Sequence, residues 1–267
     1  VSYLIREQFY NFKPRQLTIE DSLPKRLEYS LYIFCLKEWN LDSFMYRYLW
    51  NPLKKLGSRL DFLVMNRILF FLIPFYLLGL YLVYHKNLLP HSLTTFLPVF
   101  FSLIGLILVV KAFTERIHAR MSWLLLIMNH FWVALAIGFN ENFDFYDIHL
   151  YLVGVAVAGL IGYSCLYRLK QMEGDIDLNR FHGHVREHRV LAGIFLLCCL
   201  AAMGFPITPT FIGEDLIFSH IHENQILLAF FVSMSFIIDG LAIIRMYARI
   251  FLGPHSKSVY EMAYRSS

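Results

Sequence analysis

The feature that most constrains this chain is an apolar run that is interrupted near its middle. Residues 190–221 read VLAGIFLLCCLAAMGFPITPTFIGEDLIFSHI, with Gly204, Pro206 and Pro209 at the interruption. Proline lacks a backbone N–H and clashes with the preceding helical turn, so two prolines three residues apart predict a broken helix. Irregular backbone at membrane depth persists only where it is buried in protein or lines a wet cavity.

Two carboxylates, Glu214 and Asp215, lie in the apolar stretch that follows the break. Carboxylates at membrane depth are costly and are usually functional. A broken helix with acids beside the break is typical of ion and proton sites in transporters. The alternative at this point is a loop at residues 206–209 that leads into a re-entrant piece, with both acids at the water interface.

Composition places this break inside a membrane protein. Of the 267 residues, 57% are hydrophobic and 16% are charged, and the mean hydropathy is +0.51. These values exclude an ordinary soluble domain, and a formal net charge of +4 is too small to suggest a nucleic-acid partner. The four cysteines show neither metal-ligand spacing nor a pairing pattern, and we interpret them as small core residues.

Five further apolar runs accompany the broken one, at residues 68–84, 93–110, 122–139, 148–166 and 226–252. Each reaches or approaches the roughly 20 residues that a helix needs to cross a bilayer. The predicted fold is therefore an all-α integral membrane protein with about six transmembrane helices, one of them broken at residues 206–209.

Lys and Arg in the connections predict the orientation in the membrane. The connections 111–120 and 167–189 and both terminal segments are basic, whereas Lys86 is the only basic residue on the other side. Because basic loops stay on the cytoplasmic side, both termini are expected in the cytoplasm or on the equivalent matrix side. The expected location is a bacterial inner membrane. A start at Val1 without a signal peptide indicates a fragment or a processed chain.

The first 66 residues are mixed, basic and aromatic, and contain no run long enough to span a bilayer. Within residues 40–62, apolar side chains recur at helical spacing among basic ones, which predicts an interfacial amphipathic segment broken near Pro52. A soluble helical extension packed on a partner is an equally good interpretation. The predicted organisation is this segment at 1–66, a transmembrane helix and connection at 67–93, the main helical part at 94–252, and a tail at 253–267.

Several ionisable residues interrupt the predicted crossings. His130 lies in the third run, His149 opens the fourth, and Asp239 and Arg245 lie in the last. Such residues should face the bundle interior or water. Asp239 and Arg245 are six residues apart rather than three or four, so each should have its partner on another helix. With Glu214 and Asp215 the set predicts a hydrated proton relay, and a static polar network is the alternative.

The loop FHGHVREHR holds His182, His184 and His188. His184 and His188 are four residues apart, a spacing that suits metal ligands on one helix face. Because a third ligand pattern is missing, we interpret this segment as a solvated basic loop rather than as a metal site or an intramembrane enzyme site. The sequence predicts no catalytic residues, no metal and no cofactor, and the isolated chain is not expected to be an enzyme.

Four motifs resemble the antiporter-like, proton-conducting membrane subunits of respiratory complex I and of Mrp-type cation/proton antiporters. RMSWLLLIMNHFWVAL is similar to the family segment in which a basic residue, here Arg120, precedes a helix with Gln or His at the place of His130. His149 falls at the family's His-Leu pair. GFPITPTFIGEDLIF resembles the broken helix, where members carry Lys or Glu at the position of Glu214, and RMYARIFLGP resembles the helix that contains Arg245.

The resemblance implies that residues 94–252 form the second of the family's two inverted five-helix repeats. WNLDSFMYRYLWNPLKKL and the run at 68–84 resemble the C-terminal end of the longest such subunit. Two departures stand out. The first repeat, with its Lys–Glu pair, is absent, and the family's buried lysine and a nearby histidine fall at Val157 and Val153. The implied proton pathway comprises Arg120, His130, His149, Glu214, Asp215, Asp239 and Arg245.

The function that the resemblance implies is a proton-translocating or proton-coupling membrane subunit of a larger complex. Its partners would be the lipid bilayer, other membrane subunits that include a first repeat, and a peripheral cytoplasmic protein docked on residues 1–66. The partner would be either a complex I-like redox module, in which case the assembly counts as a translocase, or an inorganic-carbon (CO2/bicarbonate) uptake component. Val153 and Val157 motivate the alternative of a degenerate, non-conducting scaffold subunit.

Overall fold

The computed structural model describes residues 23–36, 41–60, 65–140 and 145–254, and every regular element in these ranges is a helix. The chain divides into two compact units, Val1–Pro52 and Leu53–Ser267. The predicted tail lies almost entirely outside the described residues, as does much of the segment 1–66.

Described residues before Leu53 are helical and largely exposed. They form α2 (Leu23–Leu36), α3 (Leu41–Met45) and a π-helical turn (Tyr46–Trp50), and α4 (Asn51–Arg59) begins at the end of this unit. The chain is not broken at Pro52 but stays helical, and the α-helical pattern is interrupted directly before α4 by the π turn, in which Asn51 N–H donates to the Tyr46 carbonyl. Pro52 is the second residue of α4, and proline is tolerated in the first turn of a helix.

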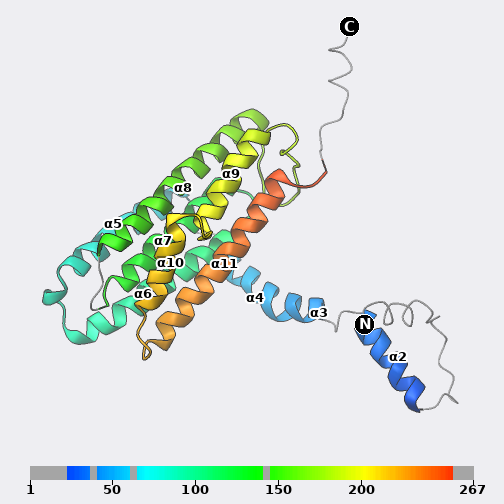
Figure 1. Ribbon diagram of the computed structural model, residues 1–267, viewed down its shortest axis with the longest axis horizontal. Helices are drawn as coiled ribbons and strands as arrows, with labels where there is room; N and C mark the ends of the chain where they lie inside the picture. Colours follow the sequence, from blue (N-terminus) through cyan, green and yellow to red (C-terminus); the bar gives the residue numbers. More distant parts are fainter. Residues whose placement is uncertain (1–22, 37–40, 61–64, 141–144, 255–267) are drawn as a thin grey trace, which may run out of the picture. The chain divides into compact units, whose positions relative to one another are not determined.

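The second unit is a bundle of helices (Figure 1). After α5 (Met65–Tyr84) and a 3-10 turn (Lys86–Leu88) come α6 (His91–Thr114), α7 (Ala119–Ile137), α8 (Phe145–Glu173), α9 (Arg189–Ala202), α10 (Pro209–Ser219) and α11 (Ile226–Phe251). Within the described residues, four stretches are long and apolar enough to cross a membrane: Leu93–Thr114, Ala119–Ile137, Tyr151–Glu173 and Ile226–Phe251. Leu72–Tyr84 and Arg189–Ala202 are shorter apolar helices. The all-α membrane fold is confirmed.

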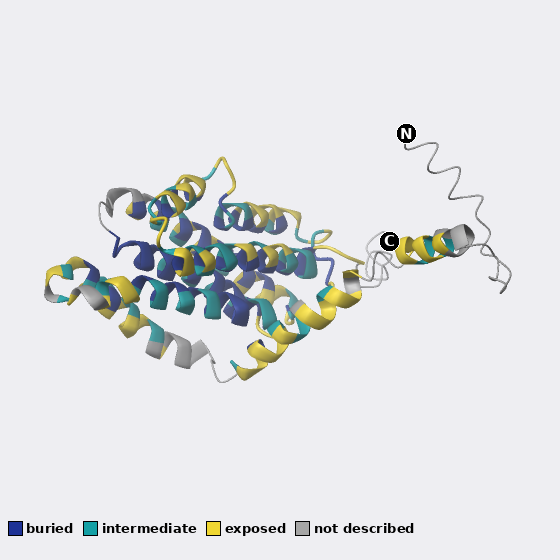
Figure 2. Ribbon diagram, turned by 90° about the horizontal axis from the view of Figure 1, so that it is seen from below, coloured by how far each residue is buried: buried dark blue, intermediate teal, exposed yellow. Residues whose placement is uncertain are grey.

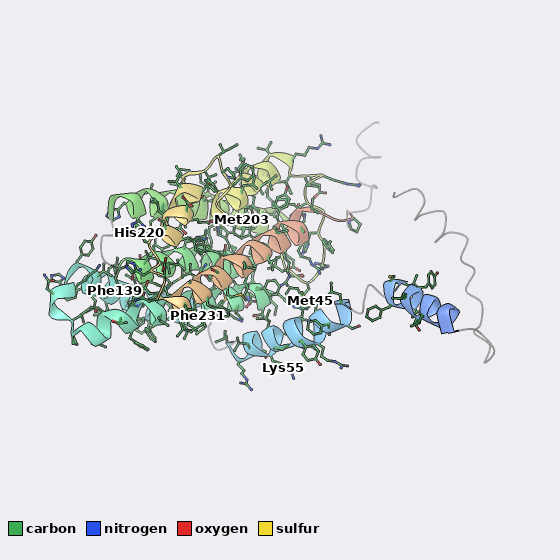
Figure 3. All side chains as sticks on the ribbon, turned by 60° about the horizontal axis from the view of Figure 1, so that its bottom comes forward. Met45, Lys55, Phe139, Met203, His220 and Phe231 are labelled. Carbon is green, nitrogen blue, oxygen red and sulfur yellow. The ribbon has the colours of Figure 1, made fainter. Side chains whose placement is uncertain are left out.

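The predicted helix break lies between α9 and α10. Met203, labelled in Figure 3, follows the last residue of α9, and Gly204 turns the chain with a positive φ of 64°. Pro209 is the first residue of α10. A backbone N–H at this position would have no acceptor within the helix, so proline costs no hydrogen bond there. The hydroxyl of Thr208 donates to the Phe205 carbonyl at 2.7 Å, and Thr210 donates to the Ala201 carbonyl. These hydroxyls therefore bind carbonyl groups that the break removes from the helical ladder.

Helix α7 is the centre of the bundle. It packs against α6 and α8, while α11 packs against α6 and α7, and α8 also carries α9 and α10. Figure 2 shows the buried residues concentrated on these tightly packed helices. Trp123 and Trp132 of α7 are fully buried, as are Asn129 and His130 between them. Asn129 and His130 therefore lie in the protein core and not at the lipid surface.

Close packing of α7 on α8 depends on glycine. The indole N–H of Trp123 donates to the Gly159 carbonyl at 2.9 Å, which fixes the ring against α8. A Cβ at Gly162 would lie 2.4 Å from this ring. Small residues at helix crossings allow such approach in membrane proteins.

Gly162→Ala should therefore destabilise the bundle. Because the Trp123 ring is buried and hydrogen-bonded, it has no room to move away, and overpacking of this kind costs about 1–3 kcal/mol. Thermal unfolding of the detergent-solubilised protein measures the effect. Gly193→Ala in α9 is the matched control, since nothing lies within 4 Å of a Cβ there, and an equal response of both variants would contradict this account.

Candidate functional site

The site is centred on the imidazole of His130, whose two nitrogens face two different helices. Its Nδ1 is hydrogen-bonded to the Tyr151 hydroxyl of α8 at 2.6 Å, and its Nε2 lies 3.5 Å from the Asp239 carboxylate of α11. All three residues are at most 1% exposed. The imidazole therefore bridges α8 and α11 through the core of the bundle.

Asn129 and Asp239 give the site additional polar atoms. Among the described residues, neither the Asn129 amide nor the Asp239 Oδ1 atom has a hydrogen-bond partner within the protein, although both are buried. Gly105 of α6 makes room for the amide, because a Cβ there would lie 2.7 Å from the Asn129 Oδ1 atom. Buried polar groups normally pair with protein or with ordered water, so these atoms are suited to bind water beside the imidazole.

Glu214 joins this group from α10, directly after the helix break. Its carboxylate lies against the backbone of Gly204, where a Cβ would come within 2.3 Å of Oε2. Glu214 is close enough to His130, Asp239 and Tyr151 for an electrostatic interaction with each of them. Close approach of α10 to α8 depends on a second glycine, since a Cβ at Gly213 would meet the Tyr151 ring at 2.2 Å. We refer to Asn129, His130, Tyr151, Glu214 and Asp239 as the His130 cluster.

Three of the predicted pathway residues, His130, Glu214 and Asp239, thus come together in the structure. His149 and Asp215 have exposed side chains and are not among the groups that contact His130. Arg120 is half-buried at the start of α7, with its guanidinium 6.0 Å and 5.7 Å from the ring centres of Tyr163 and Tyr167.

The partners of Asp239 and Arg245 lie on other helices, as their spacing predicted. Asp239 faces His130 of α7, and Arg245 donates to the Phe113 carbonyl at the end of α6 while its guanidinium lies over the Phe113 ring. Arg245 is therefore bound at the end of α6 and not in the His130 cluster.

The two valines at the family's lysine and histidine positions lie on the outer side of α8. Val153 and Val157 are 60% and 50% exposed, whereas Tyr151, Val155 and Ala158 of the same helix are buried. A side chain at position 157 therefore points away from the His130 cluster.

Sequence reasoning missed Tyr151, because a tyrosine in an apolar run is usually a core or interfacial aromatic residue. Val155 and Ala158 follow Tyr151 by four and seven residues, and apolar residues at this helical spacing predict one buried face that includes Tyr151. The hydroxyl partner itself was not detectable from the sequence.

A buried ion pair between Lys111 and Glu115 was also missed, since Lys111 counted only as a basic loop residue. Its Nζ lies 3.1 Å from Glu115 Oε2, with the two side chains 4% and 10% exposed. The backbone N–H groups of Ile117 and His118 donate to the other carboxylate oxygen. Burial opposes the charged form, but Lys111 and these N–H groups outweigh it and lower the pKa of Glu115.

The histidine-rich loop before α9 is not solvated as predicted. His182 and His184 are each 5% exposed, because the loop backbone pairs with the end of α11. His182 N–H donates to the Arg249 carbonyl at 2.9 Å and Val185 N–H donates to the Phe251 carbonyl at 3.1 Å. Burial lowers the pKa of His184, which favours its neutral form.

Gly204→Ala should displace Glu214 and destabilise the connection between α9 and α10. The new Cβ would overlap the carboxylate, and a positive φ is unfavourable for alanine. Thermal unfolding should show a lower midpoint than for Gly240→Ala, a control in α11 with nothing within 4 Å of the added Cβ. Equal midpoints for the two variants would mean that Glu214 is not held by the backbone turn.

The Lys111–Glu115 pair predicts a pH-dependent contribution to stability. Because the folded pKa of Glu115 lies below its unfolded value, the contribution is present above the unfolded pKa and is lost as pH falls through the folded one. Wild type should therefore unfold at a higher temperature than Glu115→Gln at pH 7, and the gap should narrow in acid. Glu223→Gln removes an exposed carboxylate as control, and a gap that widens in acid would contradict the prediction.

Most of these residues fall in a stretch that is similar to known membrane proteins. Residues 128–238 match a family model described as NADH:quinone oxidoreductase/Mrp antiporter, TM. The NADH-ubiquinone oxidoreductase chain 4 of Dictyostelium citrinum is 36% identical over 74 residues, 28% of this chain and 18% of that protein. The NADH-quinone oxidoreductase subunit M of Rickettsia prowazekii is 26% identical over 77 residues, 29% of this chain and 16% of that protein.

The matched region contains the entire His130 cluster except Asp239, which follows its last residue directly. The matches span less than a fifth of the length of each of these relatives. Residues 128–238, less than half of this chain, are thus similar to the membrane subunits of the NADH:quinone oxidoreductase/Mrp antiporter family.

Proposed function

We propose that this chain transfers protons through the membrane, or couples their movement to the work of a larger complex. The observation that carries the proposal is His130, fully buried and held between Tyr151 and Asp239, with Glu214 placed beside it by a broken helix. Ionisable groups at membrane depth are expensive and are typical of proton relays.

The chemistry of the His130 cluster suits such a relay. An imidazole accepts a proton at one nitrogen and releases one from the other, and it titrates near neutral pH. Here the two nitrogens face different partners, so a proton entering from the Tyr151 side would leave toward Asp239. Glu214 would exchange protons with the group from the helix break, and water bound at Asn129 would complete the connections.

The route within this chain is proposed as one segment of a longer one. The exposed face of α8 at Val153 and Val157 carries no ionisable group at the positions where the family resemblance expects them. A first repeat, upstream or on another subunit, would supply the remaining carriers. His149 and Asp215, exposed in this chain, are the predicted pathway residues best placed to meet such a neighbour.

The nature of the coupled partner is a separate question. The curated relatives are named as oxidoreductase subunits, which favours a complex I-like redox module. An inorganic-carbon uptake component, docked on the basic N-terminal segment, is the second proposal that the family resemblance supports. Purification of the intact complex through this chain, followed by mass spectrometry, distinguishes a redox module from a carbon-hydrating partner.

Glu214→Gln should reduce proton-coupled activity of the assembled complex by roughly tenfold or more, because an amide cannot carry a proton. Proton uptake into proteoliposomes, followed with a pH-sensitive dye, measures the effect. Glu223→Gln is the matched comparison: it removes an exposed carboxylate in the loop before α11, outside the His130 cluster, and should cost much less.

Assembly of each variant complex is checked by size-exclusion chromatography. Undiminished proton uptake by an assembled Glu214→Gln complex would contradict the proposed relay. The His130 cluster would then be a static polar network that fixes helix packing in a scaffold subunit.

A further inference from the structure

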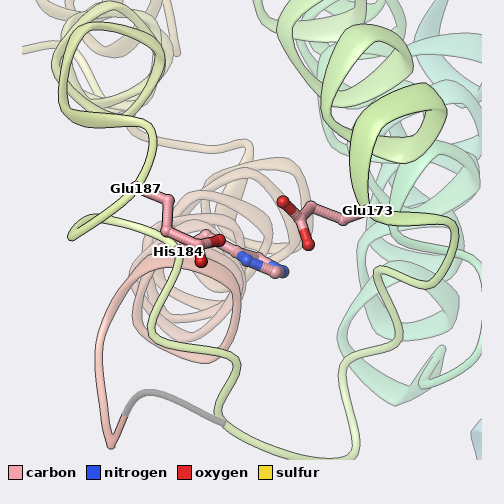
Figure 4. A group of neighbouring side chains, drawn as sticks. All are labelled: Glu173, His184 and Glu187. Atoms are coloured by element: carbon pink, nitrogen blue, oxygen red, sulfur yellow. The ribbon is translucent and has the colours of Figure 1, made fainter. Parts of the chain in front are cut away.

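A second group of ionisable side chains lies at the far end of α8. Glu173 is the last residue of α8, and His184 and Glu187 lie in the segment that precedes α9. One ligand-type atom of each residue lies within 4.8 Å of the others. Figure 4 shows the His184 ring directed toward the Glu173 carboxylate, with Glu187 beside it. We refer to these three residues as the Glu173 cluster.

His184 provides the observation that points to a ligand. Its side chain is 5% exposed, and its Nε2 atom has no hydrogen-bond partner among the described residues. A buried ring nitrogen normally has a partner. Because two carboxylates lie next to it, a cation is the group that satisfies the nitrogen and the two negative charges together.

We propose that Glu173, His184 and Glu187 bind a divalent metal ion, with zinc as the best fit. Zinc takes histidine nitrogen and carboxylate oxygen at about 2.0–2.2 Å, and sites with three protein ligands keep one position for water. A bound ion would draw the three atoms closer than their present spacing. The sequence alone favoured a solvated loop because no third ligand followed the histidines, whereas the structure supplies Glu173 from the preceding helix.

His188 supports the ligand geometry without being a ligand itself. Its Nε2 atom lies 2.7 Å from Glu173 Oε1 and so orients this carboxylate. Outer partners of this kind orient ligands and tune metal affinity. The His182 ring stacks on His184 with centroids 5.1 Å apart and limits its rotation.

The metal would act as a structural link. It would join the end of α8 to the loop before α9, and this loop already pairs with the end of α11 through Gly183 N–H on Leu252 and Val185 N–H on Phe251. Glu173 lies 22 residues after Tyr151 along α8, roughly 33 Å at the rise of an α-helix. The Glu173 cluster is therefore separate from the proposed proton route.

The proposal is tested on the full chain in mild detergent, purified without a polyhistidine tag. After equilibration with zinc and removal of free metal, elemental analysis should find one zinc ion per chain. His184→Ala and Glu187→Gln should each weaken zinc affinity by roughly tenfold or more, as expected for loss of a direct ligand. His222→Asn, which removes an exposed histidine in the loop before α11, should retain wild-type affinity.

Two further readouts keep the test decisive. Cobalt(II) substituted for zinc should give a visible absorption band in wild type that Glu187→Gln weakens, and zinc should raise the unfolding midpoint of wild type but not of His184→Ala. Because Glu187 is exposed, Glu187→Gln should fold and can be used to test zinc binding even if His184→Ala does not fold. Absence of zinc from wild type, or undiminished binding by Glu187→Gln and every folded His184 variant, would overturn the proposal.

Discussion

The arrangement of this bundle depends on the burial of one imidazole, which the central helix α7 carries into the space between its neighbours. A polar ring in a membrane core is unfavourable unless its nitrogens find partners. The Nδ1 atom of His130 is hydrogen-bonded to Tyr151 of α8, and its Nε2 atom lies 3.5 Å from the Asp239 carboxylate of α11. Both helices must therefore meet α7 at the same depth, and the polar contacts fix their register where apolar packing alone would allow sliding.

The broken helix serves the same centre. Gly204 and its neighbours turn the chain between α9 and α10, whereas a continuous helix would have kept its direction. Because the turn places Gly204 against Glu214, and Gly213 lets α10 approach the Tyr151 ring, the acid reaches the neighbourhood of His130 from a separate short helix. Thr208 and Thr210 bind the carbonyl groups that the break exposes, so an irregular backbone persists in an apolar setting.

The two ends of the bundle differ in how they are held. Beyond the break, the Asn140 and Gln225 side-chain amides exchange hydrogen bonds of 3.0 Å and 2.9 Å, which fixes the end of α7 to the start of α11. At the opposite end of α8, backbone hydrogen bonds and the Glu173–His188 contact hold the histidine-rich loop. Side-chain amides hold the first of these connections, and ionisable side chains contribute to the second.

The sequence by itself determined the helical membrane fold, the position of the break and the short set of ionisable residues from which a site is built. Apolar length, paired prolines and isolated charges are local properties, and each can be found without knowing which helices touch. A proline alone does not predict a helix end, because Pro74 and Pro98 lie inside α5 and α6, whereas Pro206 and Pro209 lie where α9 gives way to α10.

Only the tertiary structure decided which of these residues work together. It placed Glu214 beside His130 while its neighbour Asp215 is exposed, bound Arg245 to the end of α6, and brought Tyr151 into the cluster. Successive residues of a helix point in directions about 100° apart, so adjacent acids have different surroundings once neighbouring helices are in place. Packing between segments far apart in the chain decides which face of a helix is buried. The spacing of residues within one helix does not give this information.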